Sequence, residues 1–369
     1  MGRSGRGASP SLSKLHRTLL GWFRTRGRPL PWRASSDPYR IWVAEIMLQQ
    51  TRIATVLPYY ERFLLRFPNA ESVAAAQEAE VLKLWSGLGY YSRARNLRRA
   101  AQQIVSRHGG AFPFALDEAL ALPGIGSYTA AAILSTAYGE PLAALDGNIA
   151  RVLARWKAIR GDLRSGGRWQ RLGYTAQQLL PQGAAGDWNQ ALMELGETVC
   201  TPRSPRCLEC PASRWCRAKG LGLVETIPAP RRKPATVRMR IAAAILRDPR
   251  GRTLLVRDSG AHDGVLFSRL WQFPAVEVSR DAEAELAAHL RSTLGIDSTN
   301  GALVPLRPAA HAVTFRSVTL LPFLAQVPRL PRLPRTRILA IERVSELPVS
   351  SATRKIAAAG RAVGRRRSL

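Results

Sequence analysis

The sequence has 369 residues, 46% of them hydrophobic, and its 55 Lys and Arg against 26 Asp and Glu give a formal net charge of +29. This length suggests two domains or three small ones, and the charge favours a polyanionic partner, foremost nucleic acid. No apolar run reaches the roughly 18 residues of a membrane span, and the N-terminus lacks the apolar segment of a secretory signal. We expect a disordered basic tail over 1–10, no membrane association, and a cytoplasmic, nucleoid-associated protein.

Residues 11–228 have the periodicity of helices. Apolar residues recur at three- and four-residue spacing, and turns that contain Gly and Pro separate the segments. We see no internal repeat. The pattern predicts an all-α region with helices over 12–26, 38–66, 78–84, 94–108 and 116–122.

Residues 41–51, IWVAEIMLQQT, are apolar except for one carboxylate and a polar end. Glu is rarely buried unless it is paired or functional, and apolar surroundings raise its pKa because desolvation penalises the charge. A Glu that stays protonated near neutral pH can act as a general acid. Glu45 is therefore a candidate acid, and the simpler alternative places it on the solvent face of an amphipathic helix.

The segment 122–129, LPGIGSYT, lies between a short predicted helix and the strong helix former 130–137. Gly124 and Gly126 permit a tight turn with exposed backbone N–H groups, and such groups at a helix N-terminus bind phosphate. We predict a helix-hairpin-helix over about 116–137, with Gly124, Gly126 and Ser127 at a DNA phosphate.

Residues 145–149, LDGNI, precede a predicted helix over 150–159. Asp146 is either an ordinary helix cap or a second carboxylate opposite Glu45. Two carboxylates in different environments can divide the work between an acid and an anionic stabiliser. Cleavage of an N-glycosidic bond through an oxocarbenium-like sugar benefits from that division, as O-glycoside cleavage does.

All four cysteines lie within 200–216, with the spacing Cys200-x6-Cys207-x2-Cys210-x5-Cys216. Clustered thiols in a cytoplasmic chain indicate a metal or cluster site rather than disulfides. The donor set alone fits structural zinc or a [4Fe–4S] cluster. The x6-x2-x5 spacing resembles the cluster loop of the endonuclease III superfamily of DNA glycosylases, which implies the [4Fe–4S] cluster.

The periodicity changes after a Pro- and Arg-rich linker predicted over 229–235. The new pattern predicts a smaller α+β domain over 236–360, followed by a disordered basic tail over 361–369. Its expected elements are strands over 237–246, 253–256 and 311–327, and helices over 281–294 and 350–359.

Several motifs together resemble adenine DNA glycosylases of the MutY type: LPWR at 30–33, the 41–51 stretch, GLGYYSRARNL at 87–97, LPGIGSYTA, LDGN and the cysteine loop. That family removes adenine mispaired with 8-oxoguanine in base excision repair. The resemblance implies an all-α helix-hairpin-helix glycosylase with a [4Fe–4S] loop, followed by a smaller α+β Nudix-like domain that recognises 8-oxoguanine. It also implies a monomer that acts on double-stranded DNA with A opposite 8-oxoguanine or G.

The resemblance also assigns roles to single residues. Glu45 would protonate adenine N7 and Asp146 would stabilise the oxocarbenium ion, with assistance from Tyr128 and Asn148. The adenine pocket would comprise Arg33, Leu48 and Gln190. The residues that enter the duplex and contact 8-oxoguanine would be Gln50, Thr51, Leu88 and Tyr90, because a flipped base leaves a gap to fill. The simpler alternatives are core packing for the Leu and Tyr side chains and a solvated helix end for the other two.

Tyr128 separates this chain from close relatives. Strand-cleaving relatives carry Lys at this position, because a Schiff base with the sugar needs an amine. A Tyr therefore predicts a monofunctional hydrolase that leaves an abasic site.

In the second domain the resemblance rests on the strand pattern and on LWQFP at 270–274. A Nudix hydrolase needs several Glu on one helix for Mg²⁺, whereas this helix offers only Glu283 and Glu285, so we predict binding rather than hydrolysis. The family presents a Phe-Ser-His loop to 8-oxoguanine. The aligned positions are Val313, Thr314 and Phe315, which retain a hydroxyl but lack the His.

Two other functions remain possible. One is a related glycosylase for thymine or uracil mismatches or for oxidised pyrimidines, which the adenine-pocket matches disfavour. The other is a non-catalytic DNA-binding protein with a structural metal site. Glu45 and Asp146 argue against it, because neither carboxylate helps to bind a polyanion.

Overall fold

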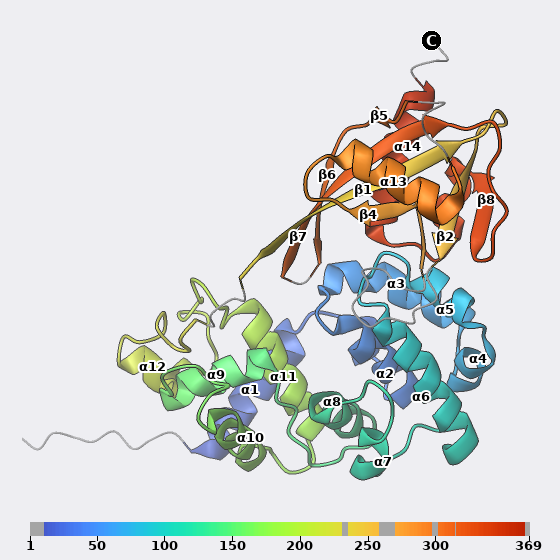
Figure 1. Ribbon diagram of the computed structural model, residues 1–369. Coiled ribbons are helices and arrows are strands. Elements are labelled where there is room, and N and C mark those ends of the chain that lie inside the picture. Colours follow the sequence, from blue (N-terminus) through green and yellow to red (C-terminus); the bar gives the residue numbers. More distant parts are fainter. Residues whose placement is uncertain (1–10, 231–234, 258–269, 297–301, 314, 366–369) are drawn as a thin grey trace, which may run out of the picture. The chain divides into compact units, whose positions relative to one another are not determined.

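The computed structural model describes residues 11–230, 235–257, 270–296, 302–313 and 315–365. The tail predicted over 1–10, most of the predicted linker and Thr314 lie outside the described residues. The chain divides into two compact units, Met1–Ala75 with Asn96–Arg232, and Ala76–Arg95 with Lys233–Leu369 (Figure 1). Among the described helices, none combines the length and apolarity needed to cross a membrane.

The first unit is helical, as the periodicity predicts. One helix, α6 (Ser92–His108), begins in the second unit and continues in the first. The other elements of the first unit are α1 (Leu12–Arg26), η1 (Pro31–Arg33), α2 (Pro38–Leu48), α3 (Ile53–Arg66), α4 (Ala70–Ala75), α7 (Leu116–Leu120), α8 (Ser127–Ala137), α9 (Gly147–Lys157), α10 (Arg168–Gln178), α11 (Ala185–Thr198), η2 (Ser213–Trp215) and α12 (Arg217–Gly220).

The single helix expected over 38–66 is wrong, because the structure contains two. Helix α2 ends at Leu48 and α3 begins at Ile53. Gln50 adopts a left-handed backbone conformation with φ of 58°, which no α-helix accommodates. The break places residues 49–52 in a turn, and this turn lines the pocket described below.

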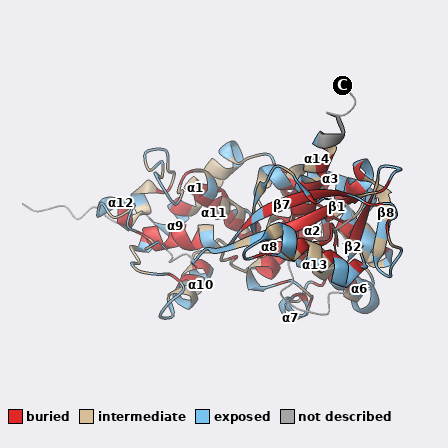
Figure 2. Ribbon diagram, turned by 45° about the horizontal axis from the view of Figure 1, so that its top comes forward, coloured by how far each residue is buried: buried red, intermediate tan, exposed pale blue. Residues whose placement is uncertain are grey.

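One core of the first unit lies between α9, α11 and α1. Trp188 and Leu195 on α11 are fully buried and pack with Leu153 on α9 and Leu19 on α1. Buried residues accordingly concentrate along α9 and α11 (Figure 2). This packing fixes the N-terminal end of α9, which carries Asp146.

In the described part of the second unit, eight strands form one mixed sheet. The two long strands, β1 and β7, pair in parallel over their whole length, and the other pairings are antiparallel. The elements are α5 (Glu78–Trp85), β1 (Val237–Arg247), β2 (Arg252–Arg257), β3 (Trp271–Gln272), β4 (Ala275–Glu277), α13 (Ala282–Leu294), β5 (Val304–Pro305), β6 (Ala309–Val313), β7 (Arg316–Gln326), β8 (Thr336–Ala340), η4 (Ile341–Glu346) and α14 (Ser351–Arg365).

Successive side chains of β1 point to opposite faces of this sheet and enter two different cores. Ala243 and Ile245 join a core that α14 covers, whereas Ala244 and Leu246 join a core that includes the buried leucines of α13. The predicted fold class, an all-α region followed by a smaller α+β domain, is confirmed. The strand expected over 311–327 is instead a hairpin of β6 and β7. The helix expected over 350–359 is α14, which continues to Arg365 and so includes the first residues of the tail predicted over 361–369.

A tight turn over residues 86–91 joins α5 to α6 within the second unit. Gly87, Gly89 and Tyr90 all have positive φ angles. The carbonyl of Val349 accepts hydrogen bonds from the hydroxyls of Ser86, at 2.6 Å, and Tyr91, at 2.9 Å. Contacts with the C-terminal part of the chain therefore hold this turn in place.

Candidate active site

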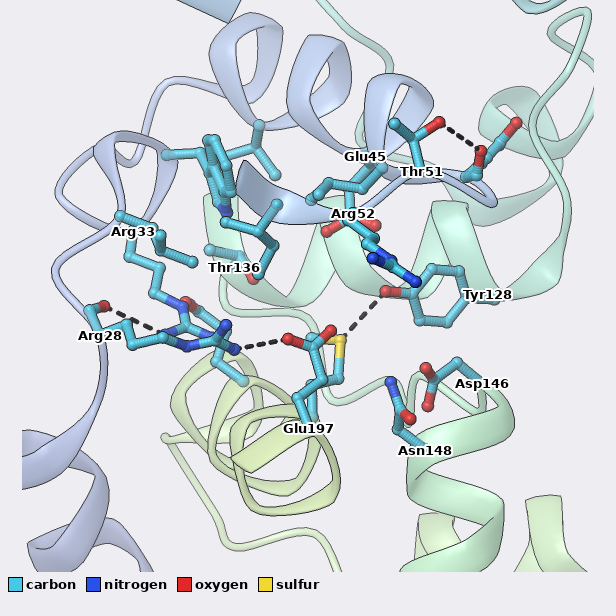
Figure 3. Close-up of a pocket in the computed structure, with 18 of the residues that line it drawn as sticks. Arg28, Arg33, Glu45, Thr51, Arg52, Tyr128, Thr136, Asp146, Asn148 and Glu197 are labelled. Atoms are coloured by element: carbon cyan, nitrogen blue, oxygen red, sulfur yellow. Dashed lines mark hydrogen bonds and ion pairs between the residues drawn. The ribbon is translucent and has the colours of Figure 1, made fainter. Parts of the chain in front are cut away.

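A pocket of about 860 Å³ opens in the first unit (Figure 3). Its walls come from η1, α2, the turn at 49–52, and helices α8, α9 and α11. The predicted site residues that line it are Arg33, Glu45, Leu48, Gln50, Thr51, Tyr128, Asp146, Asn148 and Gln190. Segments separated by more than a hundred residues are thus brought to one cavity.

Glu45 lies on the buried face of α2, which begins with Asp37 as N-cap and Pro38 in the first turn. Only 9% of Glu45 is exposed, so the solvent-face alternative is wrong. Burial raises its pKa from 4.5 to about 7, and the charges of Asp146 and Glu197 act in the same direction. A hydrogen bond with Tyr128 and the charge of Arg33 oppose this rise. Glu45 can therefore exchange a proton near neutral pH.

Tyr128 lies in the first turn of α8, directly after the hairpin. Its hydroxyl donates to Met193 Sδ at 3.0 Å, and the pKa values of Tyr128 and Glu45 depend on each other. Burial, with the nearby carboxylates, raises the pKa of Tyr128 well above its ordinary value. The phenol is thus neutral, and it belongs to the hydrogen-bonding network of the acid.

Asp146 is both a helix cap and a pocket residue. Its Oδ1 accepts a hydrogen bond of 2.7 Å from Ile149 N, so it is the N-cap of α9. Burial raises its pKa, while the N–H groups of Ile149 and Asn148 and the charge of Arg151 favour the carboxylate. Asp146 can therefore be both a helix cap and a second carboxylate of the site, because the cap holds its carboxylate at the pocket wall.

The side chain of Asn148 accepts a hydrogen bond from a buried arginine. Arg151 Nη2 donates to Asn148 Oδ1 at 2.9 Å and to the carbonyl of Gly196 at 2.7 Å, and Arg151 Nε donates to the carbonyl of Cys200 at 2.9 Å. Glycine is required at 196, because a Cβ there would lie 2.8 Å from Asn148 Cβ. Close packing of α9 on α11 thus sets the position of Asn148.

A charged cluster forms another part of the wall. Arg28 Nε and Nη2 each lie 2.7 Å from a carboxylate oxygen of Glu194, and Arg33 Nη2 lies 2.8 Å from Glu194 Oε2. Arg28 Nη2 also lies 2.5 Å from Glu197 Oε2. The motifs of the sequence indicate Arg33 but neither Arg28 nor Glu197. The spacing of Glu197, seven residues after Gln190 on one helix, was the available signal, because it places both side chains on one face.

Other predicted site residues lie elsewhere. Leu88 and Tyr90 belong to the second unit, where Leu88 is buried and Tyr90 is 38% exposed. Burial of Leu88 agrees with core packing. Thr314 lies outside the described residues, and the neighbouring Phe315 is 43% exposed beside β7.

The hairpin has the geometry of an anion site. Gly124 has φ of 83°, and a Cβ there would lie 2.9 Å from Asn96 Cβ, so only glycine fits. Gly126 is the N-cap of α8, and Gly124, Gly126 and Ser127 are exposed. The N-terminus of α8 therefore offers unshared backbone N–H groups to an anion.

The four cysteines line one small pocket with Arg155. Arg155 is 1% exposed, and its Nη1 lies 3.2 Å from Cys200 Sγ and 2.8 Å from the carbonyl of Thr201. Burial, followed by the neighbouring cysteines, raises the pKa of Cys210 to about 12. Across the described part of the chain, no three His, Cys, Asp or Glu side chains are grouped as a single metal ion would need. Four thiols around one cavity nevertheless suit a polynuclear cluster in their chemistry.

Comparison with known proteins identifies the family. Residues 43–167 match the model of the HhH-GPD superfamily base excision DNA repair proteins. The adenine DNA glycosylase of Rattus norvegicus is 33% identical over 404 residues, which cover 94% of this chain and 77% of the rat protein. The chain belongs to the adenine DNA glycosylase family. The resemblance and the enzyme class predicted from the motifs are therefore confirmed.

Other relatives match shorter regions. The Homo sapiens adenine DNA glycosylase is 44% identical over 211 residues, which cover 55% of this chain but only 39% of the human protein. A solved structure described as a thermostable thymine-DNA glycosylase has a TM-score of 0.52 and 29% identity, and it covers 57% of this chain and 97% of its own. The helical fold of the first unit is thus shared with a glycosylase named for another base.

Proposed function

We propose that this family member excises adenine opposite 8-oxoguanine or G in double-stranded DNA and leaves an abasic site. The observation that carries the proposal is a buried acid, Glu45, in one pocket with a second carboxylate, Asp146. The pocket volume of about 860 Å³ is ample for a flipped nucleoside.

In this proposal Glu45 is the general acid. Its raised pKa keeps a fraction protonated at neutral pH, and transfer of that proton to adenine N7 lets the base leave neutral. Burial raises the pKa of Asp146, and backbone N–H groups and Arg151 oppose that rise, so that the carboxylate can stabilise the cationic sugar. Asn148 is held at the same wall. Water attack completes the hydrolysis.

We further propose monofunctional chemistry and an iron–sulfur cofactor. Tyr128 offers no amine for a Schiff base, and its hydroxyl is engaged with Glu45 and Met193. Cys200, Cys207, Cys210 and Cys216 would hold the [4Fe–4S] cluster, which would cross-link the 200–216 loop. The exposed turn at the start of α8 would bind a phosphate, and Tyr90 and Phe315 offer exposed rings for the duplex.

The test is a glycosylase assay on duplexes with adenine opposite 8-oxoguanine, G, C or T, and a fifth duplex with thymine opposite G. We expect excision of adenine opposite 8-oxoguanine and G only, no covalent product with borohydride, and iron in the purified protein. Equal rates on all four adenine duplexes, or excision of thymine alone, would refute the proposal. Glu45→Gln should abolish excision and retain binding.

A further inference from the structure

The pocket contains a third carboxylate, Glu197, with no role in the proposed reaction. It lies on α11, lines the pocket together with Glu45 and Asp146, and is 37% exposed in its side chain. Figure 3 shows it between the two arginines, Arg28 and Arg33, and the catalytic group formed by Tyr128, Asp146 and Asn148.

The charges on this wall balance only when Glu197 is counted. Arg28 and Arg33 both bind Glu194, whose side chain has no exposed surface. One negative charge, that of Glu194, therefore pairs with two positive guanidinium groups. The 2.5 Å contact between Arg28 and Glu197 supplies the second negative charge.

We propose that Glu197 is an electrostatic residue of the active site, whose carboxylate neutralises the second guanidinium so that this wall carries no net charge where the sugar becomes cationic. The inference rests on the proposed function, because it concerns the charge that develops as adenine leaves. Without Glu197, Arg28 would add an uncompensated positive charge to the wall of the pocket in which that cation forms. Water screens an exposed pair, but a bound nucleoside displaces that water and strengthens the interaction.

The same charge acts on Glu45. The charged or titratable groups that influence it are Tyr128, Asp146, Glu197 and Arg33, and Arg52 lines the same pocket. Glu197 favours the protonated form of Glu45, so its removal should lower the pH at which the acid loses its proton. That shift can be measured as the pH at which excision declines on the alkaline side.

The experiment compares Glu197→Gln with Asp187→Asn. Asp187 lies on the same helix, loses the same charge, pairs only at 3.8 Å with exposed Arg24, and lies in the first turn of α11. Single-turnover excision of adenine opposite 8-oxoguanine is measured over about pH 5 to 9, together with binding to a duplex that carries a non-cleavable 2′-fluoro adenosine. For Glu197→Gln we expect the alkaline midpoint to fall by about half a unit or more, and the rate at pH 8 to fall about 3- to 10-fold. Duplex affinity should be unchanged or tighter, because the variant is more positive.

Two further variants test charge rather than shape. Glu197→Asp keeps the charge and should keep the wild-type midpoint, and it replaces Glu197→Gln as the informative variant if the latter does not fold. The double variant Arg28→Gln with Glu197→Gln restores neutrality and should recover part of the lost rate, whereas its alkaline midpoint should stay low, because Arg28 is not among the groups that act on Glu45. An alkaline midpoint of Glu197→Gln equal to that of Asp187→Asn would overturn the inference, as would equal loss at every pH with weakened binding. If the wild type excises no adenine, the proposed function itself fails.

Discussion

The Tyr128 hydroxyl on α8 acts on the pKa of the Glu45 carboxyl on α2, which it lowers by hydrogen bonding to the carboxylate. Tyr128 has one hydroxyl hydrogen, and the hydroxyl oxygen lies 3.0 Å from Met193 Sδ, to which it donates. When Glu45 is protonated it can donate to the Tyr128 oxygen, which leaves the phenol free to donate to the sulfur. When Glu45 is ionised, the phenol is drawn to the carboxylate. The two residues therefore respond together to the protonation of the acid.

This relationship predicts the effect of Tyr128→Phe. The hydrogen bond from Tyr128 lowers the pKa of Glu45, so its loss should raise that pKa above about 7. A general acid works in its protonated form, so wild-type excision should decline as pH rises through about 7, and the variant should decline at a higher pH. Single-turnover rates across pH measure both midpoints. A downward shift would contradict the arrangement.

A second prediction concerns the stability of Glu45→Gln. The pKa of Glu45 is about 7 in the folded chain, whereas an ordinary Glu, as in the unfolded chain, has a pKa of 4.5. Between these values the unfolded chain loses a proton that the folded chain keeps, so stability falls as pH rises through this window and then stays low. The neutral Gln escapes this effect. We expect the variant to gain at most about 3 kcal/mol at pH 8 over wild type, with little gain at pH 4.

Urea denaturation of both proteins at the two pH values measures this difference. The comparison also separates chemistry from folding, because the variant should be inactive although it is more stable. An inactive variant that is less stable at pH 8 would instead indicate that Glu45 holds the fold.

The sequence predicts some of these features better than others. Burial of Glu45 follows from its apolar neighbours, and the cap at Asp146 follows from local backbone chemistry. The break at Gln50 could not be predicted, because no Gly or Pro marks it and a left-handed backbone is uncommon for a residue other than Gly. Glu197 was missed for a related reason. Whether a helical carboxylate faces solvent or a pocket depends on which helices pack against it, and Arg28, its partner, is far away in the sequence.

A third prediction compares two glycines of the hairpin. At Gly124 a Cβ would lie 2.9 Å from Asn96 Cβ and the backbone has φ of 83°, so Gly124→Ala should destabilise the chain by about 1–3 kcal/mol. At Gly126 a Cβ meets nothing within 4 Å and φ is −104°, so Gly126→Ala is the matched control and should cost less than about 1 kcal/mol, the effect of Ala at an N-cap. Thermal unfolding measures both effects. Equal loss in the two variants would contradict the hairpin geometry.

The last prediction concerns Arg354, which holds the turn at 86–91. Its Nη2 lies 3.0 Å from the carbonyl of Ser86 and 2.9 Å from Ser86 Oγ, on the residue that also binds the carbonyl of Val349. Arg354→Ala removes these bonds and should loosen the turn that carries Tyr90. If Tyr90 contacts the partner base as proposed, the preference for adenine opposite 8-oxoguanine over adenine opposite G should fall several-fold.

The control for this variant is Arg343→Ala, which removes an exposed arginine that pairs with Glu346 on η4. Exposed pairs contribute little to stability, so this change should alter neither the stability of the chain nor its preference between the two duplexes. The decisive quantity is the ratio of excision rates on the two duplexes, measured at saturating enzyme. General damage to the fold would lower both rates together, whereas a loosened turn changes the ratio. An unchanged ratio in Arg354→Ala would mean that the 86–91 turn keeps its geometry without this arginine, or that the turn does not contact the partner base.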